Sequence, residues 1–446
     1  MKMPKKPPPY LEVLSKLHDP GRLIAIHRLS PSTDDYPHWD RLRHLTPPAG
    51  ITLEEWWLST KMKRIGAAKK VPLADKTGQS FQFNLPDLVQ AQLHAIDVGA
   101  GQFIGVPEPI TNPQTRDSYL IRSLIEEAIT SSQLEGAVTT REVAKAMIRT
   151  GRSPRDPSEQ MILNNYVTMR RIFELKREPL SSELVLELHR LVTEKTLKNA
   201  DAAGRLRRPD EKLVVGDEYG EVFHDPPPAA ELQARLQAMC AFANGWTPGE
   251  FVHPMVRAII LHFWLAYDHP FVDGNGRTAR ALFYWAMLHA GYWLFEFISI
   301  SNILRKGAVE YHRSFLYTET DENDLTYFIV AQVKVIRRAI AELHGYIARK
   351  SKEVQELGAQ LRALDLFNHR QADLIRHALK HPQQEYTIDG HRTSHDVVYQ
   401  TARTDLLGLK ARGVFGLRKR GKRMVFTVPH DIAERLRKLA SKVPRA

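Results

Sequence analysis

Residues 269–280, HPFVDGNGRTAR, bring together an imidazole, a carboxylate, two glycines around an asparagine, and two arginines. Long apolar segments flank this stretch on both sides, and both predict buried helices. Pro270 disfavours helical geometry at His269, so the first helix should end near Asp268. The glycines permit a tight loop that leads directly into the second helix. The chemistry of this stretch therefore lies at a helix N-terminus.

The start of the second helix is suited to bind an anion, because its first N–H groups are unpaired and the helix dipole is positive there. Arg277 and Arg280 lie three residues apart and share one face. Cations at this end of a helix cost up to about 1 kcal/mol each, which a polyphosphate between them would offset. Asp273 would repel that phosphate unless Mg²⁺ bridged the two. His269 is the group that can accept a proton near neutral pH.

Other interpretations of residues 269–280 are either less specific or excluded. DGNG alone most often marks a turn. An EF-hand is excluded because neither alignment of the glycines supplies its ligands, and Leu282 would stand at the position of the bidentate glutamate. A Walker-type loop is excluded because no Gly-Lys-Ser/Thr follows. His253 and His262 are interpreted as histidines that pack between helices.

The twelve residues resemble, without a departure, the signature of the Fic family, whose members transfer a nucleotide monophosphate, usually AMP from ATP, onto a protein hydroxyl. The resemblance extends over roughly residues 105–345. It implies a mostly α fold, with a Fic-type helical core and a β-hairpin flap. It also implies a protein adenylyltransferase with ATP as substrate, Mg²⁺ as cofactor, and a Tyr, Thr or Ser hydroxyl of a target protein, or of this chain itself, as acceptor.

The resemblance further implies a role for each position of the signature. His269 would deprotonate the target hydroxyl, which then attacks the α-phosphate in line, and Phe271 would anchor the loop. Asp273 would hold Mg²⁺ against the α- and β-phosphates. The remaining positions would bind the phosphates: Gly274, Asn275 and Gly276 as an anion cradle, Arg277 at the β-phosphate, and Arg280 at the γ-phosphate.

A second charged motif precedes this core. If a helix over about 118–136 ends near Glu135 and is capped by Gly136, Glu135 is an anion at the negative end of a dipole and should pair with a cation. Ser131, Glu135 and Gly136 resemble the inhibitory motif of one class of Fic proteins. The resemblance implies that Glu135 pairs with Arg280 and occupies the γ-phosphate position. The alternative is a solvated acid at a helix end.

Residues 212–223 have β-rich ends around a glycine-containing turn, which predicts a hairpin within an otherwise helical region. It resembles the family's flap, in which Leu213, Val214 and Val215 would align a target segment by strand addition. The alternative is an ordinary surface hairpin.

The C-terminal residues differ in charge from the rest of the chain. Residues 361–446 hold 18 Lys and Arg against eight Asp and Glu, whereas residues 51–360 hold 37 against 38. The order helix, short strand, two helices and two β-like runs predicts a small α+β winged helix-turn-helix domain over 346–446. DNA is then the expected partner. The alternative is a domain that packs on the core or makes protein contacts. The candidate DNA contacts lie on the second helix of the turn and on the wing: Arg403, Arg412, Arg418, Lys419 and Arg420.

Composition limits the remaining possibilities. Cys240 is the single cysteine, which excludes a disulfide framework and suits a reducing compartment. No apolar run reaches the ~18 residues of a membrane span. We therefore expect a cytoplasmic protein without a membrane partner. A homodimer is compatible with the sequence, and residues 1–104 carry no assignable chemistry.

Two alternative functions stay open. One is a DNA-binding transcriptional regulator whose Fic-like core senses nucleotide without catalysis. The other is an enzyme that removes AMP from a modified target, because in some relatives the inhibitory glutamate also assists that reaction.

Overall fold

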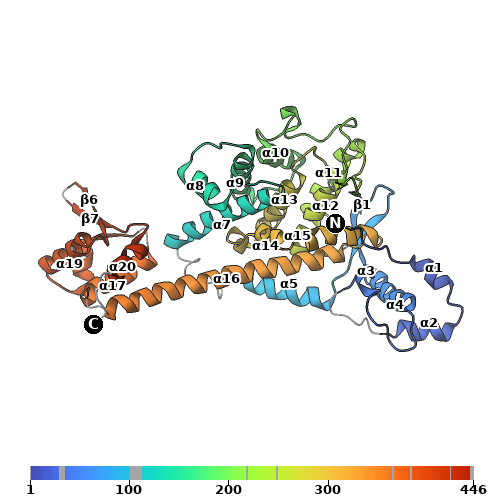
Figure 1. The fold of residues 1–446 in the computed structure, drawn as a ribbon, viewed down its shortest axis with the longest axis horizontal. Coiled ribbons are helices and arrows are strands. Elements are labelled where there is room, and N and C mark those ends of the chain that lie inside the picture. The colour runs from blue at the N-terminus through green and yellow to red at the C-terminus, as the bar shows by residue number, and fades with distance from the viewer. Residues whose placement is uncertain are drawn as a thin grey trace. The chain divides into compact units, whose positions relative to one another are not determined.

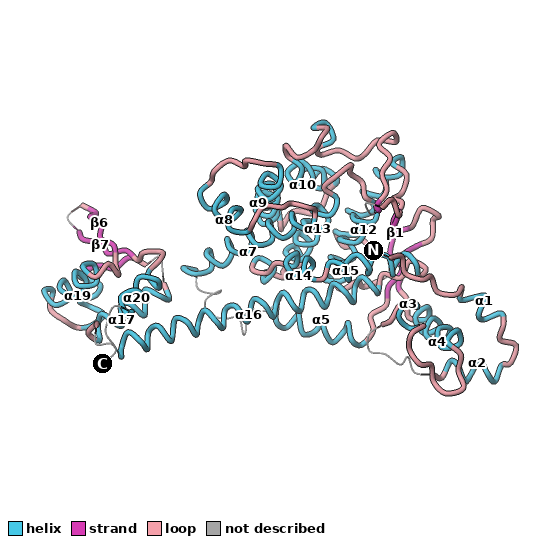
Figure 2. The backbone as a smooth tube through the Cα atoms, in the orientation of Figure 1, coloured by secondary structure: helices cyan, strands magenta, loops and turns pink. Residues whose placement is uncertain are grey.

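A computed structural model describes residues 2–29, 36–100, 113–216, 219–247, 250–363, 366–381, 384–421 and 423–441. Within them the chain is mostly helical with a few short strands, which confirms the predicted fold class (Figure 2). The chain forms two compact units, Met1–Gln102 with Arg122–Ile340, and Phe103–Ile121 with Ala341–Ala446. None of the described helices has the length and apolar character that a membrane span requires.

The first unit begins with short helices and an antiparallel β-hairpin, labelled in Figure 1. These elements are α1 (Tyr10–Ser15), α2 (Pro20–His27), α3 (Trp39–Leu42), α4 (Leu53–Gly66), β1 (Lys69–Ala74), β2 (Ser80–Phe83) and α5 (Asp87–Ala100). Thr52 and Glu55 form a capping box that fixes the start of α4.

The remainder of the first unit is helical apart from one hairpin. Its helices are α7 (Pro113–Leu134), α8 (Arg141–Thr150), α9 (Pro157–Leu175), α10 (Ser182–Thr193), α11 (Leu232–Ala243), α12 (Pro254–Asp268), α13 (Asn275–His289), α14 (Ile300–Lys306), α15 (Ala308–Thr320) and α16 (Thr326–Ala363), with strands β3 (Val215–Gly216) and β4 (Val222–His224). By sequence, α7 and α16 each contribute residues to both units.

Helices α12 and α13 pack against each other in the centre of this unit (Figure 1). Both are apolar around most of their circumference, and Trp264 and Trp285 are almost fully buried. The two predicted buried helices are therefore confirmed, and α12 ends at Asp268 as Pro270 predicts. This rigid pair fixes the position of the loop that connects it.

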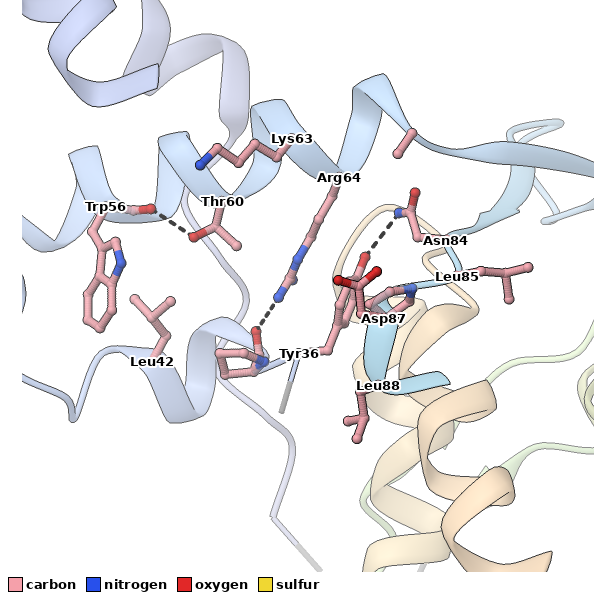
Figure 3. A pocket seen from close by; sticks show the side chains of 13 residues that line it. Tyr36, Leu42, Trp56, Thr60, Lys63, Arg64, Asn84, Leu85, Asp87 and Leu88 are labelled. Carbon is pink, nitrogen blue, oxygen red and sulfur yellow. Dashed lines mark hydrogen bonds between the residues drawn. The ribbon is translucent and has the colours of Figure 1, made fainter. Parts of the chain in front are cut away.

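The N-terminal hundred residues pack on the same unit through contacts distant in sequence. Lys61 of α4 donates to Asp321 at 2.7 Å, and Arg64 donates to the Tyr327 hydroxyl at 2.6 Å. Arg64 also donates to the Pro37 carbonyl at 3.0 Å. It lines a cavity of about 330 Å³, whose lining residues are drawn in Figure 3. The described residues within 2–100, a region without readable chemistry in the sequence, thus pack against the helical part of this unit.

The second unit contains a three-stranded antiparallel sheet and four helices of its own. Its sheet order is β5-β7-β6, and Phe426 of the central strand is buried with Leu406 and Leu436. The elements follow the order that a winged helix-turn-helix predicts, and the assignment to that fold stays a prediction. They are α17 (His369–Lys380), β5 (Glu385–Thr387), α18 (Ile388–His395), α19 (Tyr399–Ala411), β6 (Gly416–Arg420), β7 (Arg423–Thr427) and α20 (Ile432–Ser441).

Candidate active site

The loop between α12 and α13 is held by its own side chains. His269 follows α12 in the left-handed region, with φ 45°, which is uncommon for a residue with a side chain. The side chain of Asn275 bonds the backbone of Phe271 twice, accepting from its N–H at 3.0 Å and donating to its carbonyl at 2.8 Å. Phe271 is fully buried. The loop geometry is therefore determined by the core beneath it.

The ring of His269 is oriented by one hydrogen bond. Its Nδ1 lies 3.1 Å from the Ala266 carbonyl, which can only accept, so Nδ1 carries the proton and Nε2 keeps its lone pair. Burial lowers the pKa of His269 to about 4. At neutral pH the imidazole is uncharged, and Nε2 can accept a proton from a nearby hydroxyl.

A carboxylate lies directly against the first turn of α13. Gly274 is the N-cap residue of this helix and has φ 83°. Because it has no side chain to accept from the first N–H groups, the helix N-terminus stays open. A Cβ atom built on Gly276 would lie 2.2 Å from Oε1 of Glu135. Only glycine leaves room for the carboxylate, which occupies the position expected for a bound anion.

Glu135 is bonded to the second arginine of the loop. Nη2 of Arg280 donates to Oε1 of Glu135 at 2.8 Å, and Nε of Arg280 donates to the Ser131 hydroxyl at 2.8 Å. Burial by itself would raise the pKa of Glu135, but the charge and hydrogen bond of Arg280 outweigh it and lower that pKa. Gly136, with φ 90°, turns the chain away directly after the glutamate.

Asp273 and Arg277 also lie at the start of α13. Nη1 of Arg277 donates to the Val192 carbonyl at 2.8 Å, and the side chain is 1% exposed. Asp273 is 60% exposed and its Oδ1 lies 3.8 Å from Nη2 of Arg277. The described residues contain no cluster of three or more His, Cys, Asp or Glu that could hold a metal. A single open carboxylate still fits Mg²⁺ that is shared with substrate phosphates.

A cavity of about 210 Å³ opens between the start of α13, Glu135, the hairpin and α15. His269, Glu135 and Arg280 line it together with His224 and Glu319. The Nδ1 of His224 lies 2.7 Å from Glu319, and its Nε2 lies 2.7 Å from the Tyr267 carbonyl. Although burial opposes the charge, the bond to Glu319 raises the pKa of His224. No signal in the sequence predicts this pair, because its partners lie 95 residues apart.

Residues 179–287 match the Fic/DOC family. This part of the chain is a Fic/DOC domain. The match includes the α12–α13 loop and the hairpin, whereas Ser131, Glu135 and Gly136 precede it.

Curated relatives share this region at modest identity. The chain is 31% identical over 172 residues to the protein adenylyltransferase Fic of Nematostella vectensis, covering 36% of this chain and 37% of that protein. It is 34% identical over 113 residues to the protein of the same name in Drosophila willistoni, covering 24% and 20%. The chain thus spans well under half the length of these relatives. A Fic family protein of Desulfovibrio desulfuricans G20 has a similar solved structure, with TM-score 0.49 and 19% identity, covering 76% of this chain and 95% of that one.

A further histidine of the Fic domain contacts the α12–α13 loop. His189 of α10 stacks on Phe271, with ring centroids 3.7 Å apart. Its Nδ1 accepts from the Gly204 N–H at 3.0 Å, so its Nε2 donates to the Asp273 carbonyl at 2.9 Å. The sequence gives no signal for His189 beyond its place on an amphipathic helix.

The hairpin of the Fic domain forms where the sequence predicts it, and its strands are β3 and β4. Val215 pairs with His224 in the antiparallel ladder and lines the cavity. Leu213 and Val214 precede the strand, and Val214 is 52% exposed. Strand addition by these residues stays a prediction.

Outside the Fic domain, the predicted DNA contacts lie in the second unit. Arg403 is half-buried on α19, whereas Arg412, Arg418, Lys419 and Arg420 are exposed. Arg412 lies over the Phe367 ring at 5.5 Å, and Arg418 is paired with Glu385. Lys419 and Arg420 lie at the end of β6, beside the turn into β7.

His253 and His262 make structural contacts, in agreement with the prediction. Nδ1 of His253 accepts from the Met255 N–H at the start of α12, and His262 is buried with its Nε2 2.9 Å from the Tyr311 hydroxyl.

Proposed function

We propose that the chain is a protein adenylyltransferase that transfers AMP from ATP to a Tyr, Thr or Ser hydroxyl of a target protein, and that Glu135 holds it in an inhibited state. The observation that carries this proposal is the imidazole with a free Nε2 beside an open helix N-terminus, where Arg280 already binds an anion. Relatives named protein adenylyltransferase Fic support the same reaction.

In this mechanism, Nε2 of His269 accepts the proton of the target hydroxyl, and the oxygen attacks the α-phosphate. A bond from that oxygen to phosphorus forms as the bond to the bridging oxygen breaks, and pyrophosphate leaves. The N–H groups at the start of α13 and the guanidinium of Arg280 offset the charge on the phosphates. Asp273 would hold Mg²⁺, which supplies charge neutralisation on the phosphates when bound. The His189 bond to the Asp273 carbonyl positions that residue.

Inhibition follows from competition for one site. The carboxylate of Glu135 lies against Gly276 and accepts a hydrogen bond from Arg280. Both residues are among those proposed to bind the phosphates. An anion that displaces Glu135 must break a charged hydrogen bond, worth about 1.5–3 kcal/mol. The wild-type chain should therefore bind ATP in its productive position only weakly.

The test is intact-mass measurement of the full chain after incubation with ATP and Mg²⁺. Glu135→Gly should accumulate covalent AMP faster than wild type, by about tenfold or more, because the charged bond no longer competes. Glu135→Gly combined with His269→Ala should show none. Glu178→Gly, which removes an exposed acid in a turn, is the matched control and should behave as wild type.

If Glu135→Gly and wild type transfer AMP at the same rate, the inhibitory role is wrong. If transfer persists without His269, the base is wrong. If no variant modifies itself, the same assay on a lysate with labelled ATP tests for a separate target, and no transfer there contradicts the adenylyltransferase. Loss of AMP from an added modified target would favour the reverse reaction.

We also propose that the second unit binds DNA, on the ground of its exposed cations at α19 and at the β6–β7 turn. Phosphate contacts predict an affinity that falls steeply between low and moderate salt. Arg418→Gln and Lys419→Gln should weaken binding to all sequences alike. A salt-independent affinity would instead favour a protein partner.

A further inference from the structure

A second cavity, of about 440 Å³, lies behind α15 in the first unit. Two sets of residues on α15 line two different cavities. Within each set the residues recur at intervals of three and four, so each set shares one face of the helix. His312, Phe315, Leu316 and Glu319 line the candidate active site, whereas Glu310, Arg313, Ser314 and Tyr317 line the second cavity. Since the two sets are offset by two residues, they lie on nearly opposite sides of the helix. Tyr311 lies between the two faces and lines both cavities. We name the second space the rear cavity.

The lining of the rear cavity is strongly basic. Arg41 of α3, Arg313 of α15, and Lys334 and Arg338 of α16 face it, and Glu310 is the carboxylate among the described residues that line it. Cations gathered from three segments around one hollow raise the local concentration of anions. Guanidinium groups bind phosphate oxygens through paired hydrogen bonds, which favours phosphate over a simple halide.

A buried amide belongs to the wall of the rear cavity. The Gln332 side chain is 2% exposed and lines the rear cavity, yet its Nε2 has no hydrogen-bond partner among the described residues. A buried donor without a partner costs about 1–3 kcal/mol. The fold bears this cost, because Nε2 is closed to solvent and to a solute in the cavity.

Aromatic rings form another part of the wall. Tyr317 stacks on His38 with centroids 4.3 Å apart, and Tyr327 meets His38 edge-on at 5.3 Å. Such a wall suits a planar ring, whose faces pack on aromatic side chains. The cavity drawn in Figure 3 shares Tyr36 and Pro37 with the rear cavity. Its Lys63 and Arg64, however, already donate to backbone carbonyls, so the rear cavity is the better anion site.

We propose that the rear cavity binds a small organic phosphate that carries a planar ring, of the nucleotide class, at a site separate from the active site. The phosphate is bound by Arg313 and Arg338, and the ring packs near Tyr317. Because α15 is a wall of both cavities, the occupant lies one helix away from the proposed ATP site. The proposal concerns binding and does not depend on AMP transfer.

The first test is calorimetric titration of ADP into the full chain. Wild type should show a binding event that Arg338→Gln weakens by about tenfold, the equivalent of about 1.4 kcal/mol for a lost charged contact. Arg337→Gln is the matched control, since Arg337 is an exposed neighbour on α16 that does not line the cavity. Both variants replace exposed side chains and should melt as wild type does. Equal titrations for the two variants would overturn the proposal.

Photolabelling with 8-azido-ADP separates this site from the active site. Labelled peptides should include residues from segments 36–41 or 330–338, which contribute lining residues to the rear cavity and none to the active-site cavity. Arg338→Gln should lose that label and Arg337→Gln should keep it. Labelling confined to the hairpin over 213–224 would overturn the proposal. Inorganic pyrophosphate should bind more weakly than ADP, and equal affinity would exclude the ring from recognition.

Discussion

Two pairs of opposite charges connect distant parts of the first unit, and they differ in how much water reaches the acid. Lys61 and Asp321 are bonded at 2.7 Å with side chains 2% and 0% exposed. Arg280 and Glu135 are bonded at 2.8 Å, but the Glu135 side chain is 32% exposed while Arg280 is 2% exposed. The first pair joins α4 to the segment before α16, and the second joins α7 to α13.

This difference separates a structural pair from a replaceable one. Neither partner of the Lys61–Asp321 pair can be reached by a solute, so its charges are compensated only by each other and by neighbouring side chains. The Glu135 carboxylate faces a cavity, so another anion can approach the same guanidinium. The same chemistry therefore serves folding in one region and, under the proposed mechanism, inhibition in the other.

The largest effect should come from breaking the structural pair. Lys61→Ala leaves Asp321 buried without its main partner, and removal of one partner of a buried pair costs about 3–5 kcal/mol. Chemical denaturation should show this loss as a lower midpoint with an unchanged slope. Lys63→Ala, two residues along α4 and only half-buried, is the control and should cost about 1 kcal/mol or less. Equal losses for the two lysines would show that the buried pair has no special role.

These two pairs also show which features of the structure can be predicted from the sequence alone. The end of α12 at Asp268 and the glycine at the start of α13 follow from local rules about proline and positive φ. Glu135 was placed through a resemblance, because no local rule connects residues 145 positions apart. Lys61, His189 and the rear cavity were not predicted, since each depends on tertiary contacts with residues far along the chain. The sequence predicts the hairpin but not the bounds of its strands, because β-rich composition does not set where ladder pairing starts and stops.

A smaller effect should come from weakening the replaceable pair without removing it. Glu135→Gln keeps an acceptor for Arg280 but loses the charge, and a neutral hydrogen bond is worth about 1 kcal/mol less than a charged one. AMP transfer should rise about fivefold over wild type and stay below that of Glu135→Gly. Ser131→Ala, which removes the acceptor of Arg280 Nε, should leave the Glu135 bond in place. A Glu135→Gln rate equal to wild type would show that shape, and not charge, excludes ATP.

The smallest effect should be that of pH. A carboxylate whose pKa is lowered in the folded state contributes stability above its ordinary value of 4.5, and loses it only as the pH falls through the lowered pKa. Glu135 is therefore ionised and paired throughout pH 6–8. The pKa of His269, lowered to about 4 by burial, also keeps that ring neutral across this range. The ratio of AMP transfer by Glu135→Gly to that by wild type should stay constant from pH 8 to pH 6. A wild-type rate that approached the Glu135→Gly rate as the solution became more acidic would mean that protonation breaks the pair, and that a partner other than Arg280 dominates the environment of Glu135.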